Sequence, residues 1–172
     1  ACIWTTNFAD KQTCRLWRSF SVPKDAPLAR AILRITADNG YRIFLDGREI
    51  GRGGDWRYLT EYDLTSLMIP GQHTLAVEAF NDALEAGVIL GLRMQFADGQ
   101  TMEISSDPTW HVVPGDEWRW QTRKHSGAAW FPAKLIGFTG QSPWWWQPNR
   151  VIQAPPSLPV ILYFWQQSWF LA

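Results

Sequence analysis

Residues 33–51, LRITADNGYRIFLDGREIG, decide the fold class of this chain. Apolar and polar residues alternate from position 29 to position 37, which is the period of a strand with one face on a core. Asn39-Gly40 and Asp46-Gly47 then supply pairs of residues that tolerate positive φ, the strongest short signal for tight turns between strands. The stretch therefore predicts three consecutive strands joined by tight turns, and an all-β domain.

The rest of the chain repeats this pattern of short strands separated by turn residues. Pro-, Gly- and Asp-rich separators recur along the sequence, and no stretch of ten or more residues keeps a helical period. Many short strands at this spacing are typical of a β-sandwich, here a jelly roll. We expect strands at residues 3–5, 15–22, 29–37, 41–45, 49–52, 58–63, 73–81, 88–96, 101–105, 110–113 and 133–138.

Length and charge limit the function classes. At 172 residues the chain is long enough for one domain with a substantial core. Sixteen basic and sixteen acidic residues give no net charge, which argues against nucleic acid or an anionic membrane surface as the main partner. The twelve tryptophans serve either as core and interface filler, the commoner use, or as a stacking platform for a ligand.

The two cysteines leave one question open. Cys2 and Cys14 each lie in or beside an expected strand, so the sequence is compatible with a disulfide or with two buried thiols. Their spacing carries no metal-binding signature.

The C-terminal segment differs from the rest of the chain. It is rich in tryptophan and proline, and no charged residue follows Arg150. The apolar run at residues 158–165, LPVILYFW, is either a final core strand or a juxtamembrane segment whose aromatic residues lie at the membrane interface. We therefore expect a jelly-roll β-sandwich domain over residues 1–140 and a separate segment over residues 141–172.

Several runs of residues resemble a known family. A strand ending in Arg18-Ser19-Phe20 precedes ITADNGYRIFLDGREIG and DWRYLTEYDLTSLMIPGQHTLAVEAFN. This region resembles the galactose-binding-like jelly-roll domains that accompany bacterial α-L-rhamnosidases and related glycosidases. Ile3-Trp4 matches the usual start of such domains and DPTW, at residues 107–110, their closing strand, so the resemblance covers roughly residues 1–138. It implies a non-catalytic module of a kind that binds sugars in some proteins and only packs in others.

A second, shorter resemblance concerns the end of the chain. The run FWQQSWF at residues 164–170 is similar to the segment that enters the first membrane helix of bacterial sensor histidine kinases. Together the two resemblances imply an extracytoplasmic sensor domain, periplasmic or at the cell surface, anchored to the membrane by sequence beyond residue 172.

No set of residues predicts catalysis. His73, His111 and His125 lie on separate elements without zinc-binding spacing. The glycine-rich run at residues 51–54 lacks the end of a phosphate loop, and Glu61 with Asp63 is an ordinary carboxylate pair on a strand. We therefore expect a domain that is not an enzyme, without a cofactor or a catalytic metal.

Two aromatic clusters are candidate sugar sites, because a sugar needs an aromatic face and planar polar groups. Trp56, Arg57 and Tyr58 form the first. Trp118 and Trp120 form the second, and they would lie on one side of the chain if it were extended there. The competing interpretation is a lid over the end of the sandwich for Trp56, and burial against the C-terminal segment for Trp118 and Trp120.

The loop that begins with Asn81 and Asp82 could add polar groups to such a site. A structural calcium is an alternative role for the oxygen-bearing residues in these loops, although their spacing is not diagnostic. The residues concerned are Asp38, Asn39, Asp82 and Glu85.

These observations predict a ligand-sensing, carbohydrate-binding domain of a membrane receptor such as a sensor histidine kinase. Two alternatives stay open. One is an accessory module, binding or structural, of a glycoside hydrolase. The other is an interaction domain that forms a homodimer through its tryptophans.

Overall fold

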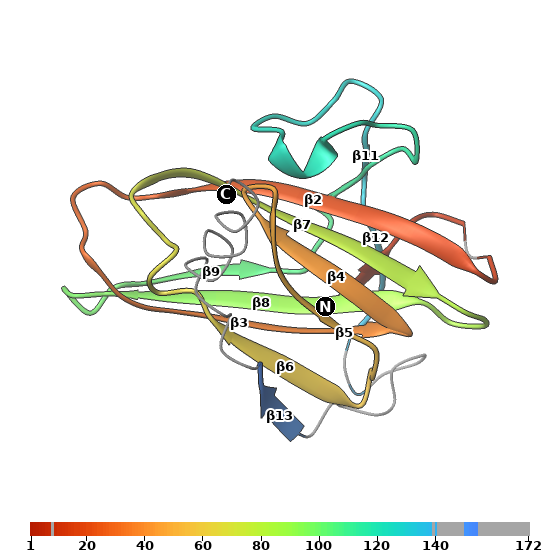
Figure 1. The fold of residues 1–172 in the computed structure, drawn as a ribbon, viewed down its shortest axis with the longest axis horizontal. Helices are drawn as coiled ribbons and strands as arrows, with labels where there is room; N and C mark the ends of the chain where they lie inside the picture. Colours follow the sequence, from red (N-terminus) through yellow and green to blue (C-terminus); the bar gives the residue numbers. More distant parts are fainter. Residues whose placement is uncertain (8, 139, 141–149, 155–172) are drawn as a thin grey trace, which may run out of the picture.

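The computed structural model describes residues 1–7, 9–138, 140 and 150–154. Within these residues, two β-sheets pack face to face and a loop with one short 3-10 turn covers one of them (Figure 1). The strands are β1 (Cys2–Trp4), β2 (Gln12–Val22), β3 (Leu28–Asp38), β4 (Gly40–Leu45), β5 (Arg48–Gly53), β6 (Tyr58–Asp63), β7 (Gly71–Asn81), β8 (Gly87–Phe96), β9 (Thr101–Ser105), β10 (His111–Val112), β11 (Phe131–Pro132), β12 (Lys134–Gly137) and β13 (Arg150–Gln153).

The strand order is that of a two-layer sandwich. The seven-stranded sheet has the order β12-β1-β8-β3-β6-β13, and β9 also pairs with β8. The six-stranded sheet has the order β11-β10-β2-β7-β4-β5. All pairings are antiparallel except that of β13 with β6, which is parallel. The predicted all-β jelly-roll sandwich is confirmed.

The two predicted turns behave differently. Asp46 and Gly47, with φ of 50° and 85°, make the tight turn of the β4–β5 hairpin as predicted. Asn39 and Gly40 do not have positive φ, and the prediction of a hairpin turn there is wrong. They carry the chain from β3 in one sheet to β4 in the other, because β3 pairs with β6 and β8 while β4 pairs with β5 and β7.

Apolar side chains fill the space between the sheets, and a second apolar cluster lies on the outer side of the six-stranded sheet. Trp4 and Trp110 belong to the central core, with 0% and 1% of their surface exposed. The outer cluster consists of Trp17, Phe44, Ala76, Val113, Trp120 and Trp130. Residues 114–130, which we call the flap, contribute to this cluster and cover that side of the sheet (Figure 1).

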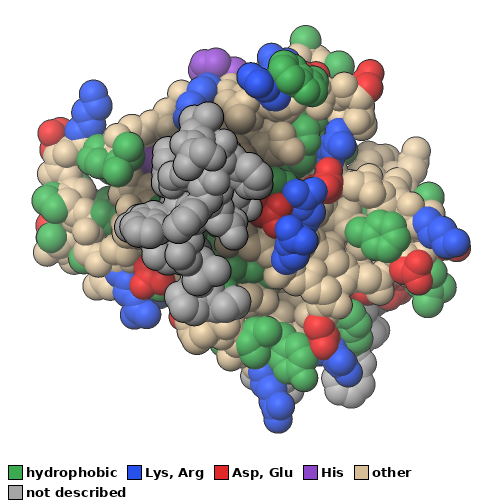
Figure 2. All heavy atoms as spheres, viewed as in Figure 1, with side chains coloured by type: hydrophobic (Ala, Val, Ile, Leu, Met, Phe, Trp, Pro, Cys, Tyr) green, Lys and Arg blue, Asp and Glu red, His purple; other side chains and the backbone are tan. Residues whose placement is uncertain are grey.

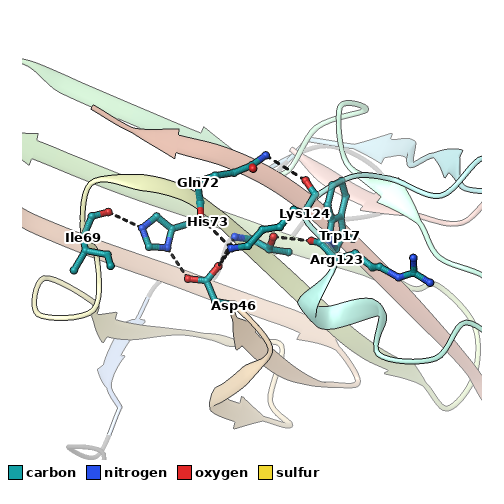
Figure 3. Close-up of polar contacts among 8 residues, drawn as sticks. Trp17, Asp46, Ile69, Gln72, His73, Arg123 and Lys124 are labelled. Carbon is teal, nitrogen blue, oxygen red and sulfur yellow. Dashed lines mark hydrogen bonds and ion pairs between the residues drawn. The ribbon is translucent and has the colours of Figure 1, made fainter. Parts of the chain in front are cut away.

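Polar contacts fasten the flap to the sheet near the β4–β5 turn (Figure 3). The Lys124 ammonium lies 3.4 Å from the Asp46 carboxylate and donates to the Gln72 carbonyl oxygen at 3.1 Å. The Arg123 carbonyl oxygen accepts from the Thr74 hydroxyl at 2.9 Å and from the Trp17 indole N–H at 3.2 Å. The flap is therefore held through its own backbone as well as by its apolar side chains.

A buried histidine lies at the end of this network. Nδ1 of His73 is 2.6 Å from Oδ2 of Asp46, and Nε2 is 2.6 Å from the Ile69 carbonyl oxygen (Figure 3). Both partners are hydrogen-bond acceptors, so this geometry is satisfied when both ring nitrogens carry a proton. Oδ1 of Asp46 also accepts from the Thr74 backbone N–H at 2.8 Å. Asp46 thus joins the hairpin turn to β7.

Three further features bear on the predictions. Cys2 and Cys14 are buried and do not form a disulfide, and burial raises the pKa of the Cys14 thiol to about 12.

Strand β13 lies within residues 141–172, the segment that we predicted to be separate, and it pairs with β6 of the sandwich. Among the described residues no helix is long and apolar enough to span a membrane. The predicted tail strand or juxtamembrane run at residues 158–165 lies outside the described residues.

Candidate functional site

Four connections meet at one end of the sandwich, and we call this region the loop end. It consists of residues 5–7, 9–11, 38–40, 54–57 and 82–86, together with Asn81 at the end of β7. The Lys11 backbone N–H donates to the Asp82 carbonyl oxygen at 2.9 Å, and the Leu84 N–H donates to Oδ1 of Asp10 at 3.3 Å. The Thr36 hydroxyl is 3.4 Å from the Asp55 carbonyl oxygen, which places the third connection beside the end of β3.

Asn39 ties the crossing between the sheets to the β7–β8 loop. Its backbone N–H donates to the Phe80 carbonyl oxygen at 2.6 Å, and its side-chain oxygen accepts from the Asp82 backbone N–H at 2.6 Å. The peptide bond between Asp38 and Asn39 is cis. The side-chain bond to the Asp82 backbone holds two loops that are far apart in the sequence in one fixed arrangement.

The predicted cluster of Trp56, Arg57 and Tyr58 lies on the third connection. Arg57 forms an ion pair with Asp55 at 2.8 Å, and hydrogen bonds from the Arg57 side chain and backbone lower the pKa of the Asp55 carboxyl. The Arg57 guanidinium also lies 5.9 Å from the centre of the Tyr58 ring. Trp56 is half-buried, whereas Arg57 is exposed. The cluster thus combines aromatic rings with a fixed planar cation at the loop end.

Two buried side-chain oxygens at the loop end have no hydrogen-bond partner. They are Oδ1 of Asp38 and Oδ1 of Asn81, whose residue is completely buried. The Asn81 amide nitrogen is oriented by the carbonyl oxygens of Ala9 and Leu84, at 3.2 and 3.4 Å, so its oxygen points away from them. Burial, and the nearby charge of Glu85, raise the pKa of the Asp38 carboxyl.

Oxygen atoms of carboxylates, amides and main-chain carbonyls are the ligands that calcium prefers. The unpartnered oxygens of Asp38 and Asn81, with the carboxylate of Glu85 close enough to act on Asp38, fit such an ion in chemical type. Considering only His, Cys, Asp and Glu, the described part of the chain contains no group of three or more that could hold a metal. Any calcium at the loop end would therefore depend on amide and carbonyl oxygens.

The raised pKa of Asp38 predicts how stability depends on pH. In the folded state the carboxyl keeps its proton to higher pH than in the unfolded chain, so stability falls as pH rises from the unfolded pKa to the folded one. Asp38→Asn removes this penalty. We expect the variant to be more stable than the parent at pH 7 in the presence of EDTA, and equally stable at a pH below both pKa values. Urea unfolding at the two pH values measures the difference, and equal stability at pH 7 would contradict it.

The second predicted cluster, Trp118 and Trp120, lies elsewhere. Both residues belong to the flap, whose hydrogen bonds and ion pair join it to β2, to β7 and to the β4–β5 turn. Trp118 is 74% exposed, with the Arg119 guanidinium 4.2 Å from its ring centre. Trp120 is 2% exposed, with its ring 6.2 Å from that of Phe44.

The expectation that these two rings share one side is therefore wrong. Arg119 has φ of 52°, and a 3-10 turn begins at Trp120, so the chain is not extended here. The left-handed residue and the turn send the two rings in different directions. Trp120 packs in the outer apolar cluster, whereas Trp118 is exposed beside the Arg119 guanidinium.

Sequence reasoning did not find the polar row on the outer face of the six-stranded sheet. The Arg15 Nε donates to Glu78 at 3.1 Å, and the Arg42 guanidinium reaches the same carboxylate at 3.4 Å. These residues belong to three strands, and only the pairing register places them side by side. Alternation along each strand was a signal that they face outward, but it did not show which ones are neighbours.

The surface carries charges of both signs. On the face in Figure 2, basic and acidic side chains lie among each other and neither sign forms a continuous area. This distribution agrees with the zero net charge of the chain. It favours a neutral ligand over a polyanion.

Comparisons with known proteins give a consistent result. No family model matches the chain. A curated α-L-rhamnosidase of Streptomyces avermitilis is 33% identical over 148 residues, which cover 80% of this chain and 14% of the relative. The chain thus spans about a seventh of the length of the curated relative that it matches.

Two solved structures share the fold. The α-L-rhamnosidase of Streptomyces avermitilis in complex with L-rhamnose is 29% identical, with a TM-score of 0.74, over 83% of this chain and 15% of that one. The Pleurotus ostreatus lectin is 24% identical, with a TM-score of 0.74, over 83% of this chain and 43% of that one. The chain therefore has the galactose-binding-like β-sandwich fold that occurs in rhamnosidases and in this lectin.

Proposed function

We propose that this chain is a non-catalytic carbohydrate-binding module, carried as an accessory domain by a larger glycoside hydrolase polypeptide. The observation that carries the proposal is the match to an α-L-rhamnosidase along 80% of this chain but only 14% of that enzyme. A segment of that proportion is the size of one domain among several.

The loop end supplies the chemistry that such a module needs. Trp56 and Tyr58 offer ring surface for the apolar side of a sugar ring. The Arg57–Asp55 pair and the polar atoms of Asn39 and Asp82 offer donors and acceptors for its hydroxyl groups. Because hydrogen bonds already hold the side chains of Asn39 and Arg57, to the Asp82 backbone and to Asp55 respectively, little side-chain entropy is lost when a sugar binds.

A bound calcium ion would neutralise the Asp38 carboxylate and coordinate the Asn81 amide oxygen, and so order the loops around them. We therefore propose that calcium, where present, supports binding through the shape of the loop end. Addition of calcium is expected to stabilise the parent chain, and to stabilise the Asp38→Asn variant less, because the variant lacks one anionic ligand.

Trp56→Ala is the variant that tests the sugar site. In titration calorimetry with L-rhamnose and a panel of neutral sugars, we expect the variant to bind the preferred sugar at least about tenfold more weakly than the parent, because it loses the stacking face. Trp118→Ala is the matched control, since it removes an exposed tryptophan that lies outside the loop end, and it should leave affinity unchanged.

The results separate the alternatives. Loss of binding in Trp118→Ala, with Trp56→Ala unaffected, would move the site to the flap. Absence of binding to every sugar of the panel, with calcium and without it, would refute the binding function. In either case, hydrolysis of an aryl rhamnoside by the full polypeptide, and none by this chain alone, would still support the accessory-module part of the proposal.

The sensor interpretation rests on residues 164–170, which lie outside the described residues. It stays a prediction, together with an extracytoplasmic location, a membrane anchor and a homodimer. The rhamnosidase match favours the accessory module, because it covers 80% of this chain and only 14% of the enzyme. Light scattering on the chain with and without residues 151–172 tests the dimer.

A further inference from the structure

An exposed aromatic ring lies beside the loop end, on the outer face of the six-stranded sheet. Phe80 is 42% exposed and is the residue before Asn81. Its neighbours in the sheet are Thr13 on β2 and Gly40 on β4. Because residues paired across strands share a face, the ring has a small side chain on one flank and none on the other. Part of the ring is therefore accessible.

A row of planar polar groups runs next to this ring. Glu78 is two residues before Phe80 and so faces the same way. Arg15 and Arg42 lie opposite Glu78 on the two neighbouring strands, and both contact its carboxylate. The side chains of Arg15, Glu78 and Arg42 are 25%, 23% and 48% exposed, so they stay within reach of a ligand.

Arg15 is fixed in place from three sides. Besides Glu78, its guanidinium donates to the Gly115 carbonyl oxygen at 2.5 Å and lies 5.7 Å from the centre of the buried Trp120 ring. Both contacts come from the flap, which therefore orients the polar row. Fixed guanidinium and carboxylate groups can bind hydroxyl groups without first losing side-chain freedom.

The flap also turns this part of the sheet into a recess. A cavity of about 250 Å³ is lined by Thr13, Arg15, Glu78, Val113 and Gly115. Its volume is below that of typical drug-sized pockets, which start at about 300 Å³. A single sugar residue is a suitable occupant, with its hydroxyl groups on the Arg15–Glu78 pair and its neighbour in the saccharide on the Phe80 ring.

The recess and the loop end are continuous through the backbone of β7. The Phe80 carbonyl oxygen accepts from Asn39, a residue of the loop end, at 2.6 Å. Phe80 and Asp82 are two positions apart, which in a strand is about 7 Å. Sugar residues joined in one chain could therefore contact both places at once.

We propose that the outer face around Phe80 is a second carbohydrate subsite, so that the domain takes an oligosaccharide of two or more neutral sugar residues. This inference rests on the proposed function, since the first residue would occupy the loop end. The fixed Arg15–Glu78–Arg42 row makes the second subsite selective for a hydroxyl-rich ligand over a merely apolar one.

Phe80→Ala tests the subsite in the complete chain. The probes are L-rhamnose and its α-linked disaccharide and trisaccharide, and binding is measured by calorimetry and on a glycan array that includes other neutral saccharides. We expect the parent to bind its preferred oligosaccharide about tenfold more tightly than the corresponding monosaccharide, and Phe80→Ala to lose that gain while its monosaccharide affinity is unchanged. Phe131→Ala is the control, because Phe131 is an exposed ring, 66% accessible, on another strand of the same sheet.

Each outcome decides the proposal. Equal loss for monosaccharide and oligosaccharide would place Phe80 in the first site and overturn a second one. Unchanged oligosaccharide affinity in Phe80→Ala would also overturn it, while the loop-end proposal would stand if Trp56→Ala still abolished binding. A parent chain that binds no saccharide would refute both proposals together. Oligosaccharide binding lost in Phe80→Ala but not in Trp56→Ala would place the whole site on the outer face, and would overturn both the loop-end site and the arrangement of two subsites.

Discussion

Replacing Trp110 with alanine is expected to lower the free energy of unfolding by about 3 to 5 kcal/mol, the usual cost of removing a buried tryptophan. Trp110 is 1% exposed and belongs to the central core. Its indole N–H donates to the Ser105 carbonyl oxygen at 2.9 Å, and its own carbonyl oxygen accepts from the Ala133 N–H at 2.8 Å. The substitution thus removes a large apolar side chain and the shorter of two hydrogen bonds to the Ser105 carbonyl oxygen, which also accepts from Arg18 at 3.4 Å.

Urea unfolding followed by circular dichroism measures this change, and the melting temperature should fall by about 10 °C or more. Trp118→Ala is the matched control, because Trp118 is 74% exposed and its removal opens no cavity. It should cost at most about 0.5 kcal/mol. Similar losses in the two variants would show that Trp110 is not part of a tightly packed core.

Replacing Asp46 with alanine is expected to lower the free energy of unfolding by about 3 kcal/mol. Its carboxylate faces His73 at 2.6 Å, accepts from the Thr74 backbone N–H at 2.8 Å and lies 3.4 Å from Lys124. The His73 side chain is only 4% exposed, so loss of its partner leaves a buried polar ring that water cannot easily reach. Asp46 is 35% exposed, which keeps the expected cost at the lower end of the range for buried pairs.

The Asp46→Asn variant distinguishes the contribution of the Asp46–His73 pair from that of the turn conformation. Asp46 has φ of 50°, a conformation that asparagine tolerates and alanine does not, so the asparagine variant keeps the turn but loses the charge. We expect it to be less destabilised than Asp46→Ala by about 1 kcal/mol. The ¹⁵N chemical shifts of His73 report whether both ring nitrogens carry protons in the parent chain. If both variants lost less than about 1 kcal/mol in the free energy of unfolding, the result would contradict a stabilising role for the Asp46–His73 pair.

Alternation and turn residues predicted most strands. They failed where the conformation of a segment depends on contacts with residues that are distant in the sequence. Asp46-Gly47 acts within its own hairpin, so a two-residue motif was sufficient. Asn39-Gly40 is an equally strong turn motif but joins two sheets, and its sequence alone does not show this difference. Strand β13 has four exposed residues and pairs at an edge through its backbone, so it leaves no alternation to detect.

The sequence also predicted some parts of the candidate site and not others. Trp56, Arg57 and Tyr58 are adjacent in the sequence, and composition alone made them candidates. Asn81 and Asp82 were candidates too, but their contact with Asn39 depends on the connection between the sheets. The burial of Trp120 could not be predicted, because it depends on the path of the flap, residues 114–130, over the sheet. Trp120 packs there beside Phe44, which faces outward from its strand and is buried under the flap.

The amino-acid sequence was enough to predict an all-β sandwich, because alternation and turn chemistry act over a few residues and are written in the order of the chain. The galactose-binding-like type followed from the resemblance of residues 1–138 to a known family. Only the tertiary structure decided which loops form one end and which outward-facing side chains become neighbours. Arg15 and Glu78 are 63 residues apart, and the register between β2 and β7 brings them into contact. That register follows from the packing of the whole core, so no local stretch contains it.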